Sequence, residues 1–196
     1  MKNHRRHTIL EIAQTLLQER GLRKMTISMI AQRADIAVGT VYLEFSSKGE
    51  ILGELAHQQF QGILRAMRRA SMSSCGPRER LKRMMWARTS AFIKLGKDDT
   101  LRHILFEQRG LKEVEYQRLI FRQRQLDLLH DFFEAISEDT PLPGEPGQSA
   151  TTLSLAMISM EPPHVFAFDT QDREGHFDRL IDVLVCGLFD SKECPS

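Results

Sequence analysis

The sequence has few cysteines and no long apolar run, and each absence excludes a class of protein. Its three cysteines, Cys75, Cys186 and Cys194, form no CxxC pair, which favours free thiols in a reducing compartment over a disulfide framework. No stretch approaches the roughly 20 apolar residues that a membrane-spanning helix requires. The opening residues, MKNHRRHTIL, contain no signal-peptide core. We therefore predict a cytoplasmic protein with no membrane partner.

The sequence also lacks the short motifs of the common enzyme classes. It contains no G-x-S-x-G nucleophile elbow, H-E-x-x-H zinc motif, phosphate-binding glycine loop or dinucleotide fingerprint. His103 and Glu107 have the i, i+4 spacing of two metal ligands on a helix, but the sequence indicates no third ligand. A polar pair is therefore the better interpretation. We predict no catalysis, no metal site and no cofactor.

Charge is nearly balanced overall but uneven along the chain. The formal net charge is +1, yet residues 1–48 contain eight basic and four acidic side chains, a balance of +4, so residues 49–196 carry −3. Excess basic charge in one segment suits contact with phosphate groups. The charge distribution thus favours a nucleic-acid partner for the N-terminal quarter.

Apolar residues in the N-terminal segment recur at helical spacing. An apolar stripe over residues 9–17 ends before Gly21, a residue type common just after a helix. Thr26 is the expected N-cap of a short second helix. Residues 34–45 then contain a tight turn followed by a third short helix. The segment is predicted to form three helices.

The rest of the chain continues this helical pattern. Ser47 and Glu50 have the spacing of a capping box, which predicts a long fourth helix that ends near Ser71. Loops rich in glycine, proline and serine separate the later apolar stripes. The chain is predicted to be all-α with about nine helices. The later ones are expected at about 77–95, 100–109, 112–136, 149–160 and 174–189, with an irregular segment at 165–168.

The stretch ADIAVGTVYLEF, residues 34–45, contains poor helix formers where the apolar spacing asks for a helix. Gly39 costs a helix roughly 0.5–1 kcal/mol relative to alanine. A short helix of this kind is useful as the second member of a helix-turn-helix, which lies in the major groove of DNA. Gly39 would allow close backbone approach, and Val38 would offer a methyl surface to thymine. Val41 and Phe45 are expected to turn inward.

The stretch TISMIAQRADIAVGTVYLEFSSKGEIL, residues 26–52, resembles the DNA-binding signature of the TetR family of bacterial transcriptional regulators. The resemblance covers roughly residues 8–55. It implies a DNA-binding domain of three helices over residues 1–50 and a helical ligand-binding and dimerisation domain over residues 51–196. It also implies a homodimer that represses transcription from a double-stranded DNA operator until a small molecule releases it.

The resemblance assigns roles to individual residues at the DNA. Phosphate contacts are expected from Thr26, Thr40, Tyr42 and Lys48, and base-edge contacts from Val38 and Gly39, with Thr40 suited to either role. Ala37 lies beside them, at the start of the third helix. One of Arg5 and Arg6 is also expected to contact phosphate, with a solvated tail as the alternative.

Two positions depart from the family pattern. The turn commonly reads Gly-Val-Ser, whereas this chain has Asp35-Ile36-Ala37 and so lacks the serine cap, which Asp35 is expected to replace. Glu44 places a carboxylate where the family has aromatic, histidine or basic residues. It would either accept from a cytosine amino group or, as we favour, repel phosphate at the rim of the interface.

The C-terminal part supports only compositional predictions for the effector and the dimer. We expect a largely apolar effector, with Arg102, Arg109 or His103 able to orient an acidic end; the alternative is a DNA-binding protein of the same fold that has no effector and acts through protein partners. The expected pocket residues are Phe92, Leu95, Arg102, His103, Leu105, Phe106, Arg109, Phe121, Phe166 and Phe168. The expected dimer interface comprises Leu153, Met157, Met160, Phe177, Leu180, Ile181, Leu184 and Leu188.

Overall fold

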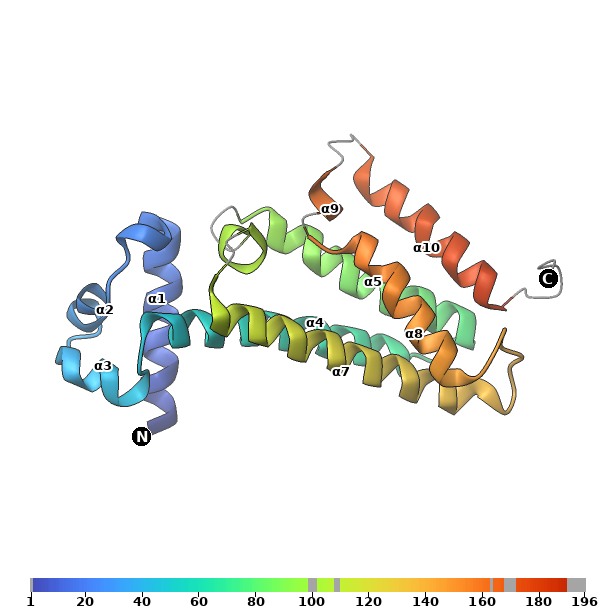
Figure 1. Ribbon diagram of the computed structural model, residues 1–196, viewed down its shortest axis with the longest axis horizontal. Coiled ribbons are helices and arrows are strands. Elements are labelled where there is room, and N and C mark those ends of the chain that lie inside the picture. The colour runs from blue at the N-terminus through green and yellow to red at the C-terminus, as the bar shows by residue number, and fades with distance from the viewer. Residues whose placement is uncertain (1, 99–101, 108–109, 163, 168–171, 190–196) are drawn as a thin grey trace. The chain divides into compact units, whose positions relative to one another are not determined.

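The computed structural model describes residues 2–98, 102–107, 110–162, 164–167 and 172–189, and every regular element in these residues is a helix (Figure 1). This confirms the predicted all-α class. None of the described helices is long and apolar enough to cross a membrane. The elements are α1 (Lys2–Lys24), α2 (Ile27–Arg33), α3 (Val38–Glu44), α4 (Lys48–Ser71), α5 (Pro77–Gly96), the π-helix η1 (His103–Glu107), α7 (Lys112–Ser137), α8 (Pro146–Ala156), the 3-10 helix η2 (Met157–Met160), α9 (His164–Ala167) and α10 (Arg173–Phe189).

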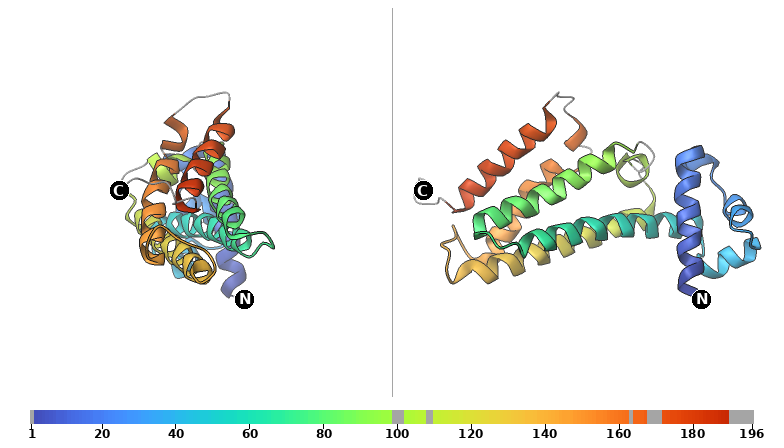
Figure 2. Two further views of the ribbon diagram at one scale, coloured as in Figure 1. Left: turned by 90° about the vertical axis from the view of Figure 1, so that its right-hand side faces the viewer. Right: turned by 180° about the vertical axis from the view of Figure 1, so that it is seen from behind.

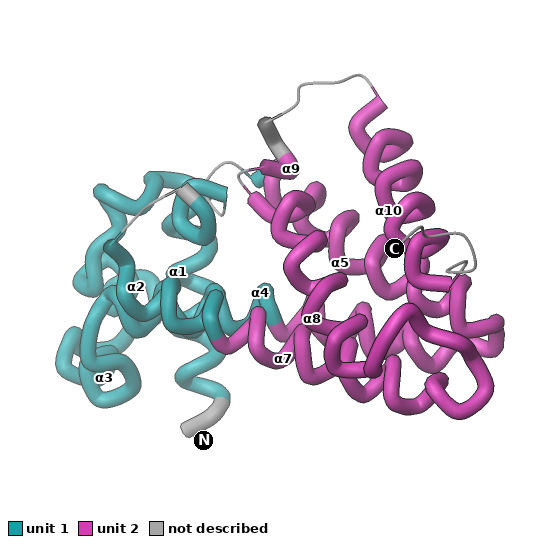
Figure 3. Tube along the Cα trace, turned by 45° about the vertical axis from the view of Figure 1, so that its right-hand side comes forward, with its two compact units in different colours: residues 1–60, 98–119 teal, residues 61–97, 120–196 magenta. Residues whose placement is uncertain are grey.

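The chain divides into two compact units (Figure 3). Unit 1 comprises Met1–Phe60 and Asp98–Leu119, and unit 2 comprises Gln61–Lys97 and Ile120–Ser196. Helices α4 and α7 each contribute residues to both units. The predicted boundary after residue 50 divides the chain by function, whereas the two units divide it by packing. The functional boundary stays a prediction.

The core of unit 1 is built from the apolar stripes that the sequence predicts. Helix α2 packs against both α1 and α3, and each helix points its apolar positions inward because their spacing places them on one face. Val41 and Phe45 are both buried, which confirms the expected inward face of α3. The other buried side chains on these helices include Ile9, Ala13, Leu16, Leu17, Ile30 and Ala31.

The ends of the N-terminal helices follow local chemistry. Gly21 interrupts α1 with a φ of 74°, in the left-handed region that favours glycine, and a last helical turn follows it. The backbone N–H of Met29 donates to Thr26 Oγ1 at 3.2 Å, which confirms the predicted N-cap. The N–H of Glu50 donates to Ser47 Oγ at 3.0 Å, which confirms half of the capping box. In the other half, the Glu50 carboxylate accepts from the N–H of Ser46, not Ser47.

Unit 2 gathers α5, α8, α9 and α10 with the later parts of α4 and α7. Helix α5 packs along α10 and also contacts α9, while α8 leads directly into η2 (Figure 2). Its core contains buried methionines and phenylalanines from the two helices α5 and α7. Those buried side chains include Met84, Met85, Phe92, Phe121, Phe132 and Phe133.

Three segments differ from the structure predicted for them. The expected helix at 100–109 contains a π-helix at His103–Glu107, where Arg118 Nη2 donates at 2.5 Å to the carbonyl of Leu105 and so occupies an acceptor in the helical ladder. The predicted helix at 149–160 begins earlier, at Pro146, because proline suits the first turn, and it tightens into η2. The segment expected to be irregular forms the single turn α9.

Most of the predicted dimer-interface residues lie in the core of the chain itself. Leu153, Met157, Met160, Ile181 and Leu188 are all buried within unit 2, and their place in a dimer interface stays a prediction. Apolar residues at helical spacing face whatever covers them, and here the chain's own helices do so. Phe177, Leu180 and Leu184 are half-buried.

Leu153 should therefore behave as a core residue. We expect Leu153→Ala to lower the free energy of unfolding by about 2–5 kcal/mol, through lost burial and the cavity left behind. The matched control is Leu119→Ala, which removes the same atoms from an exposed side chain and should change stability by no more than about 0.5 kcal/mol. Urea titration followed by circular dichroism measures both. Equal effects of the two substitutions would contradict the placement of Leu153.

Candidate nucleic-acid interface

A tight turn joins α2 to α3 and sets where the second helix begins. The backbone N–H of Ile36 donates to the carbonyl of Ala31 at 3.0 Å, and Asp35 adopts a φ of 52°. Few residues other than glycine take this left-handed conformation, but aspartate tolerates it. Asp35 thus adopts the left-handed backbone conformation of the glycine that is common at this position of the family pattern. The prediction that it caps α3 is wrong, because Ala37 is the N-cap and no side chain caps that helix.

One face of α3 is exposed and carries the residues predicted to meet base edges. Val38 and Gly39 are exposed, and Tyr42 is 53% exposed. Nothing lies within 4 Å of the position that a Cβ on Gly39 would occupy. The backbone at Gly39 is therefore accessible to a close-approaching surface, as a recognition helix in a major groove requires.

Leu43 is a large apolar residue on this face that the sequence prediction overlooked. Its side chain is 79% exposed, the largest value among the exposed large apolar side chains in the described part of the chain. It lies four residues after Gly39, so the two positions share a helix face. An exposed leucine beside Tyr42 can contact a thymine methyl group. The signal was present in the spacing from Gly39.

The threonines predicted to contact phosphate lie at the start of each short helix. Thr26 is exposed, and its Oγ1 accepts from Met29, so its hydroxyl hydrogen is available to a phosphate oxygen. Thr40 is half-buried in the first turn of α3, beside the exposed Ala37. Both positions carry small donors that could meet a DNA backbone.

Arg6 is held within unit 1 by several groups. Its guanidinium donates to the carbonyl of Glu44 at 2.5 Å and lies 4.0 Å from the centre of the Phe45 ring. It also lies within 3.5 Å of carboxylate oxygens of Glu50 and Glu54. These contacts tie α1 to the end of α3 and the start of α4. Arg6 is thus a structural residue here, and a phosphate role would have to compete with these contacts.

Glu44 does not project toward solvent as the sequence suggested. Its side chain is 4% exposed, and Oε1 lies 3.6 Å from Arg5 Nη1. The carboxylate is therefore turned into unit 1, where the pairing with Arg5 offsets its charge. Both expectations for Glu44, acceptance from cytosine and repulsion of phosphate, are contradicted by this burial.

Lys48 connects the start of α4 to the end of α1. Its ammonium donates to the carbonyls of Leu22 and Met25, at 2.5 and 2.7 Å. Partial burial lowers the pKa of Lys48. An ammonium carries three donors, so one remains for the phosphate contact that the sequence predicts. That contact stays a prediction.

The predicted pocket residues do not fall in one unit. Arg102, His103, Leu105 and Phe106 belong to unit 1, whereas Phe92, Leu95 and Phe121 belong to unit 2. Phe92 and Phe121 pack edge to face at 5.8 Å in the core. Arg109 and Phe168 lie outside the described residues. Phe166 lies in α9, with its side chain outside the described part.

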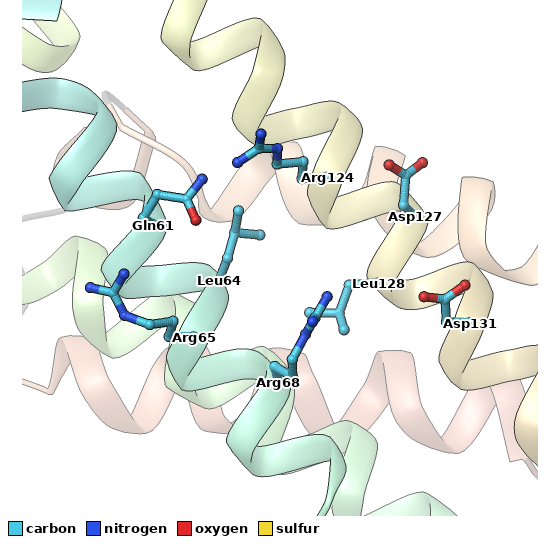
Figure 4. Close-up of a pocket in the computed structure, with 8 residues that line it drawn as sticks. All are labelled: Gln61, Leu64, Arg65, Arg68, Arg124, Asp127, Leu128 and Asp131. Carbon is cyan, nitrogen blue, oxygen red and sulfur yellow. The ribbon is translucent and has the colours of Figure 1, made fainter. Parts of the chain in front are cut away.

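A cavity of about 380 Å³ lies between α4 and α7, within unit 2. Charged side chains from the two helices surround Leu64 and Leu128 (Figure 4). Its size falls in the range of small-molecule sites, but its lining is more polar than the predicted apolar pocket. The remaining residues that line it are Gln61, Arg65, Arg68, Arg124, Asp127 and Asp131.

A buried ionic cluster occupies the core of unit 2. Arg88 on α5 is fully buried and pairs with Glu161 Oε1 at 2.5 Å, while Arg122 Nη2 on α7 lies 2.7 Å from Glu161 Oε2. Arg88 Nε also donates to Oε1 of Gln125. Burial lowers the pKa of Arg88 to about 10, so its guanidinium remains charged at neutral pH. Sequence reasoning missed these residues because a buried arginine has no periodic signal.

Comparison with known proteins identifies the N-terminal segment. Residues 9–55 match the profile of bacterial regulatory proteins of the tetR family. The HTH-type transcriptional repressor KstR2 of Mycobacterium tuberculosis is 36% identical over 85 residues, which are 43% of this chain and 42% of that protein. KstR2 of Rhodococcus jostii is 44% identical over 54 residues, 28% of this chain and 26% of that protein. The matched stretches span less than half of each relative.

Two solved structures share the fold along nearly the whole chain. SmeT in complex with triclosan superposes with a TM-score of 0.70 at 18% identity, covering 96% of this chain and 93% of that one. NalD, the secondary repressor of the MexAB-OprM multidrug efflux pump in Pseudomonas aeruginosa, has a TM-score of 0.70 at 19% identity, covering 96% and 99%. At these identities the likeness establishes the fold, including the helical C-terminal part.

Glu50 should make the stability of the chain depend on pH. Hydrogen bonds from the backbone N–H and the hydroxyl of Ser46, with the nearby Arg6, lower the pKa of Glu50 in the folded state. Its contribution is thus fully present above the unfolded pKa of about 4.3 and is lost as pH falls through the folded value. We expect Glu50→Gln to lower the melting temperature at pH 7, and the difference from wild type to shrink below pH 4.

The control for this measurement is Glu138→Gln, which removes the charge of an exposed carboxylate in unit 2. Its difference from wild type should change little over the same pH range. A difference for Glu50→Gln that stays constant from pH 7 to pH 3.5 would argue against the role of the Ser46 hydrogen bonds.

Proposed function

We propose that this member of the TetR family of bacterial regulatory proteins represses transcription by binding an operator in double-stranded DNA. The observation that carries the proposal is the helix-turn-helix of α2 and α3, whose second helix exposes Val38, Gly39, Tyr42 and Leu43 on one face. Four adjoining residues on a short helix suit a major groove. A DNA partner also places the protein in the bacterial cytoplasm.

Each exposed residue is assigned a role by its chemistry. Val38 and Leu43 present apolar surface to thymine methyl groups, and Gly39 admits the close approach that this contact needs. Phosphate oxygens accept hydrogen bonds from the hydroxyl groups of Thr26, Thr40 and Tyr42. These contacts fix the register of the protein on the duplex. Lys48 supplies a charged phosphate contact. Arg5 and Arg6 hold α3 in place.

The operator is read by a homodimer. Two recognition helices related by a two-fold axis and about 34–36 Å apart match successive major grooves on one side of the duplex. Exposed apolar side chains on α8, η2 and α10, namely Leu155, Ile158 and Val183, support an interface there. A near-palindromic operator is the expected target.

A small molecule with a largely apolar body releases the repressor by binding unit 2. Such a ligand must bind the DNA-incompetent conformation more tightly than the competent one, and couplings of this kind are typically about 1–3 kcal/mol. The 380 Å³ cavity supports the presence of ligand-sized space in this unit. The alternative is a regulator without an effector, supported by the close packing of Phe92 and Phe121.

Selection from a pool of random DNA duplexes tests the DNA-binding proposal directly. The full chain should enrich a near-palindromic sequence with nanomolar affinity at physiological salt. Val38→Ala should change which bases are enriched, because it alters a base contact. Enrichment of no sequence above the background pool would overturn the proposal.

Lys48 provides a test of the phosphate contact. We expect Lys48→Met, which keeps the aliphatic stem, to flatten the slope of log affinity against log salt by about one unit on every sequence tested. Lys94→Met, an exposed lysine in unit 2, is the matched control and should leave the slope unchanged. Fluorescence anisotropy at several salt concentrations measures it. Weaker binding with an unchanged slope would mean that Lys48 acts only by holding Leu22 and Met25.

The dimer proposal is tested at its exposed apolar residues. We expect Leu155→Glu and Val183→Glu to convert a dimer into a monomer, because each buries a charge in the interface at a cost that pairing does not offset. Met72→Glu places the same charge on an exposed apolar residue away from α8 and α10 and should leave the dimer intact. Light scattering at micromolar concentration reads the mass. A wild-type protein that is monomeric there would end the proposal.

A further inference from the structure

The ionic cluster in unit 2 has more positive than negative charge. Glu161 presents its two carboxylate oxygens to two different arginines, Arg88 at 2.5 Å and Arg122 at 2.7 Å. Among the residues that the structure describes, neither arginine pairs with a second carboxylate. One carboxylate thus serves two guanidinium groups, and the pair retains a surplus positive charge.

Burial of this cluster costs free energy, which makes stability a poor explanation for it. Arg88 is 0% exposed and Glu161 is 8% exposed, and moving two charges out of water costs several kcal/mol for each ion. Replacing a buried ion pair by apolar residues is often neutral or stabilising. A planar guanidinium is well suited to bidentate capture of a carboxylate, which gives the cluster a use in recognition.

The two arginines differ in their exposure to solvent. Arg122 has a side chain that is 44% exposed, so it marks where the cluster reaches the surface. Arg88 is deeper, with its guanidinium 4.8 Å from the centre of the Phe92 ring and 6.0 Å from that of Phe121. The charge of Arg88 thus lies beside two aromatic rings. A cation beside aromatic rings suits a ligand that has an anionic group on an apolar body.

Glu161 lies at the end of a short helical turn in unit 2. It follows the single-turn 3-10 helix Met157–Met160, and Pro162 comes directly after it. Short 3-10 segments have poorer hydrogen-bond geometry than α-helices. Besides Glu161, this turn contacts the cluster through the carbonyl of Met157, which lies 3.3 Å from Arg88 Nη1. Withdrawal of the Glu161 side chain would therefore free the Nη2 groups of both arginines.

We propose that Arg88 and Arg122 form the binding site for the carboxylate of an apolar monocarboxylic acid, and that Glu161 occupies this site as an internal substitute when no ligand is bound. The ligand carboxylate takes the place of the Glu161 carboxylate, which turns into solvent, and the apolar body packs against Phe92 and Phe121. This proposal deepens the proposed function, since it names the chemical class of the effector. It replaces Arg102, His103 and Arg109 as the expected partners of an acidic end.

Binding of octanoate to the full chain, measured by calorimetry without DNA, tests the site. Octanamide is the neutral probe of matched length. Wild type should bind octanoate at least ten-fold more tightly than octanamide. Arg122→Gln, at a half-exposed position where folding should survive, should abolish this preference while leaving octanamide binding unchanged.

Glu161→Gln tests the internal substitute, because it removes the competing charge but keeps the shape of the side chain. We expect it to bind octanoate about ten-fold more tightly than wild type does. Glu138→Gln, an exposed glutamate in the same unit, is the control and should match wild type. If Glu161→Gln does not fold, the wild-type and Arg122→Gln comparison decides the proposal alone.

Two results would overturn the proposal. One is a wild-type protein that shows no preference for octanoate over octanamide, even if Glu161→Gln acquires one, because the pair would then be structural. The other is a preference that survives Arg122→Gln. Repeating the titration with the selected operator DNA separates this proposal from the proposed function: octanoate that binds with the expected preference without releasing DNA contradicts the regulatory role and leaves the site standing.

Discussion

The exposed reading surface depends on the burial of two residues, Val41 and Phe45, beneath α3. This helix has only seven residues, contains Gly39, and begins without a side-chain cap, so it would not be stable alone. Its inward side chains join the core of unit 1, and Arg6 holds its last carbonyl. Because that packing supplies the stability, the outward face is free to consist of residues chosen for DNA. Everything proposed about recognition follows from this division between the two faces.

Much of unit 1 was predictable because its determinants are local. Helix periodicity predicted the buried faces. Thr26 could be predicted as an N-cap because its hydroxyl needs only a backbone N–H three residues further along the chain. Charged side chains were not predictable in the same way. Arg5 pairs with the Glu44 carboxylate, and Arg6 donates to the Glu44 carbonyl 38 residues further along the sequence; no spacing rule indicates such contacts. The prediction that Glu44 faces solvent failed because tertiary contacts decide where a long polar side chain lies.

The C-terminal half shows a different limit of sequence reasoning. An apolar stripe on a helix states that something covers it, without saying whether the cover is the same chain or a second copy. Leu153 and Leu155 lie two residues apart on α8, yet the first is buried and the second is exposed. Arg88 presents the opposite case. In the sequence a charged residue interrupts the apolar stripe, and only the structure shows that Glu161 pairs with it. Effector chemistry was therefore inferred from an ion pair that the sequence conceals.

The ties that hold Arg5, Arg6, Arg33 and Lys48 also bear on how the protein searches a chromosome. Four of the eight basic side chains in residues 1–48 are engaged by carboxylates or carbonyls of unit 1. Affinity for arbitrary DNA comes almost entirely from the release of counterions by free basic groups. On the proposed function, a domain with half of these basic side chains engaged internally is expected to bind random sequence more weakly than one whose basic side chains are all free. Fewer copies would then be held on the rest of the genome.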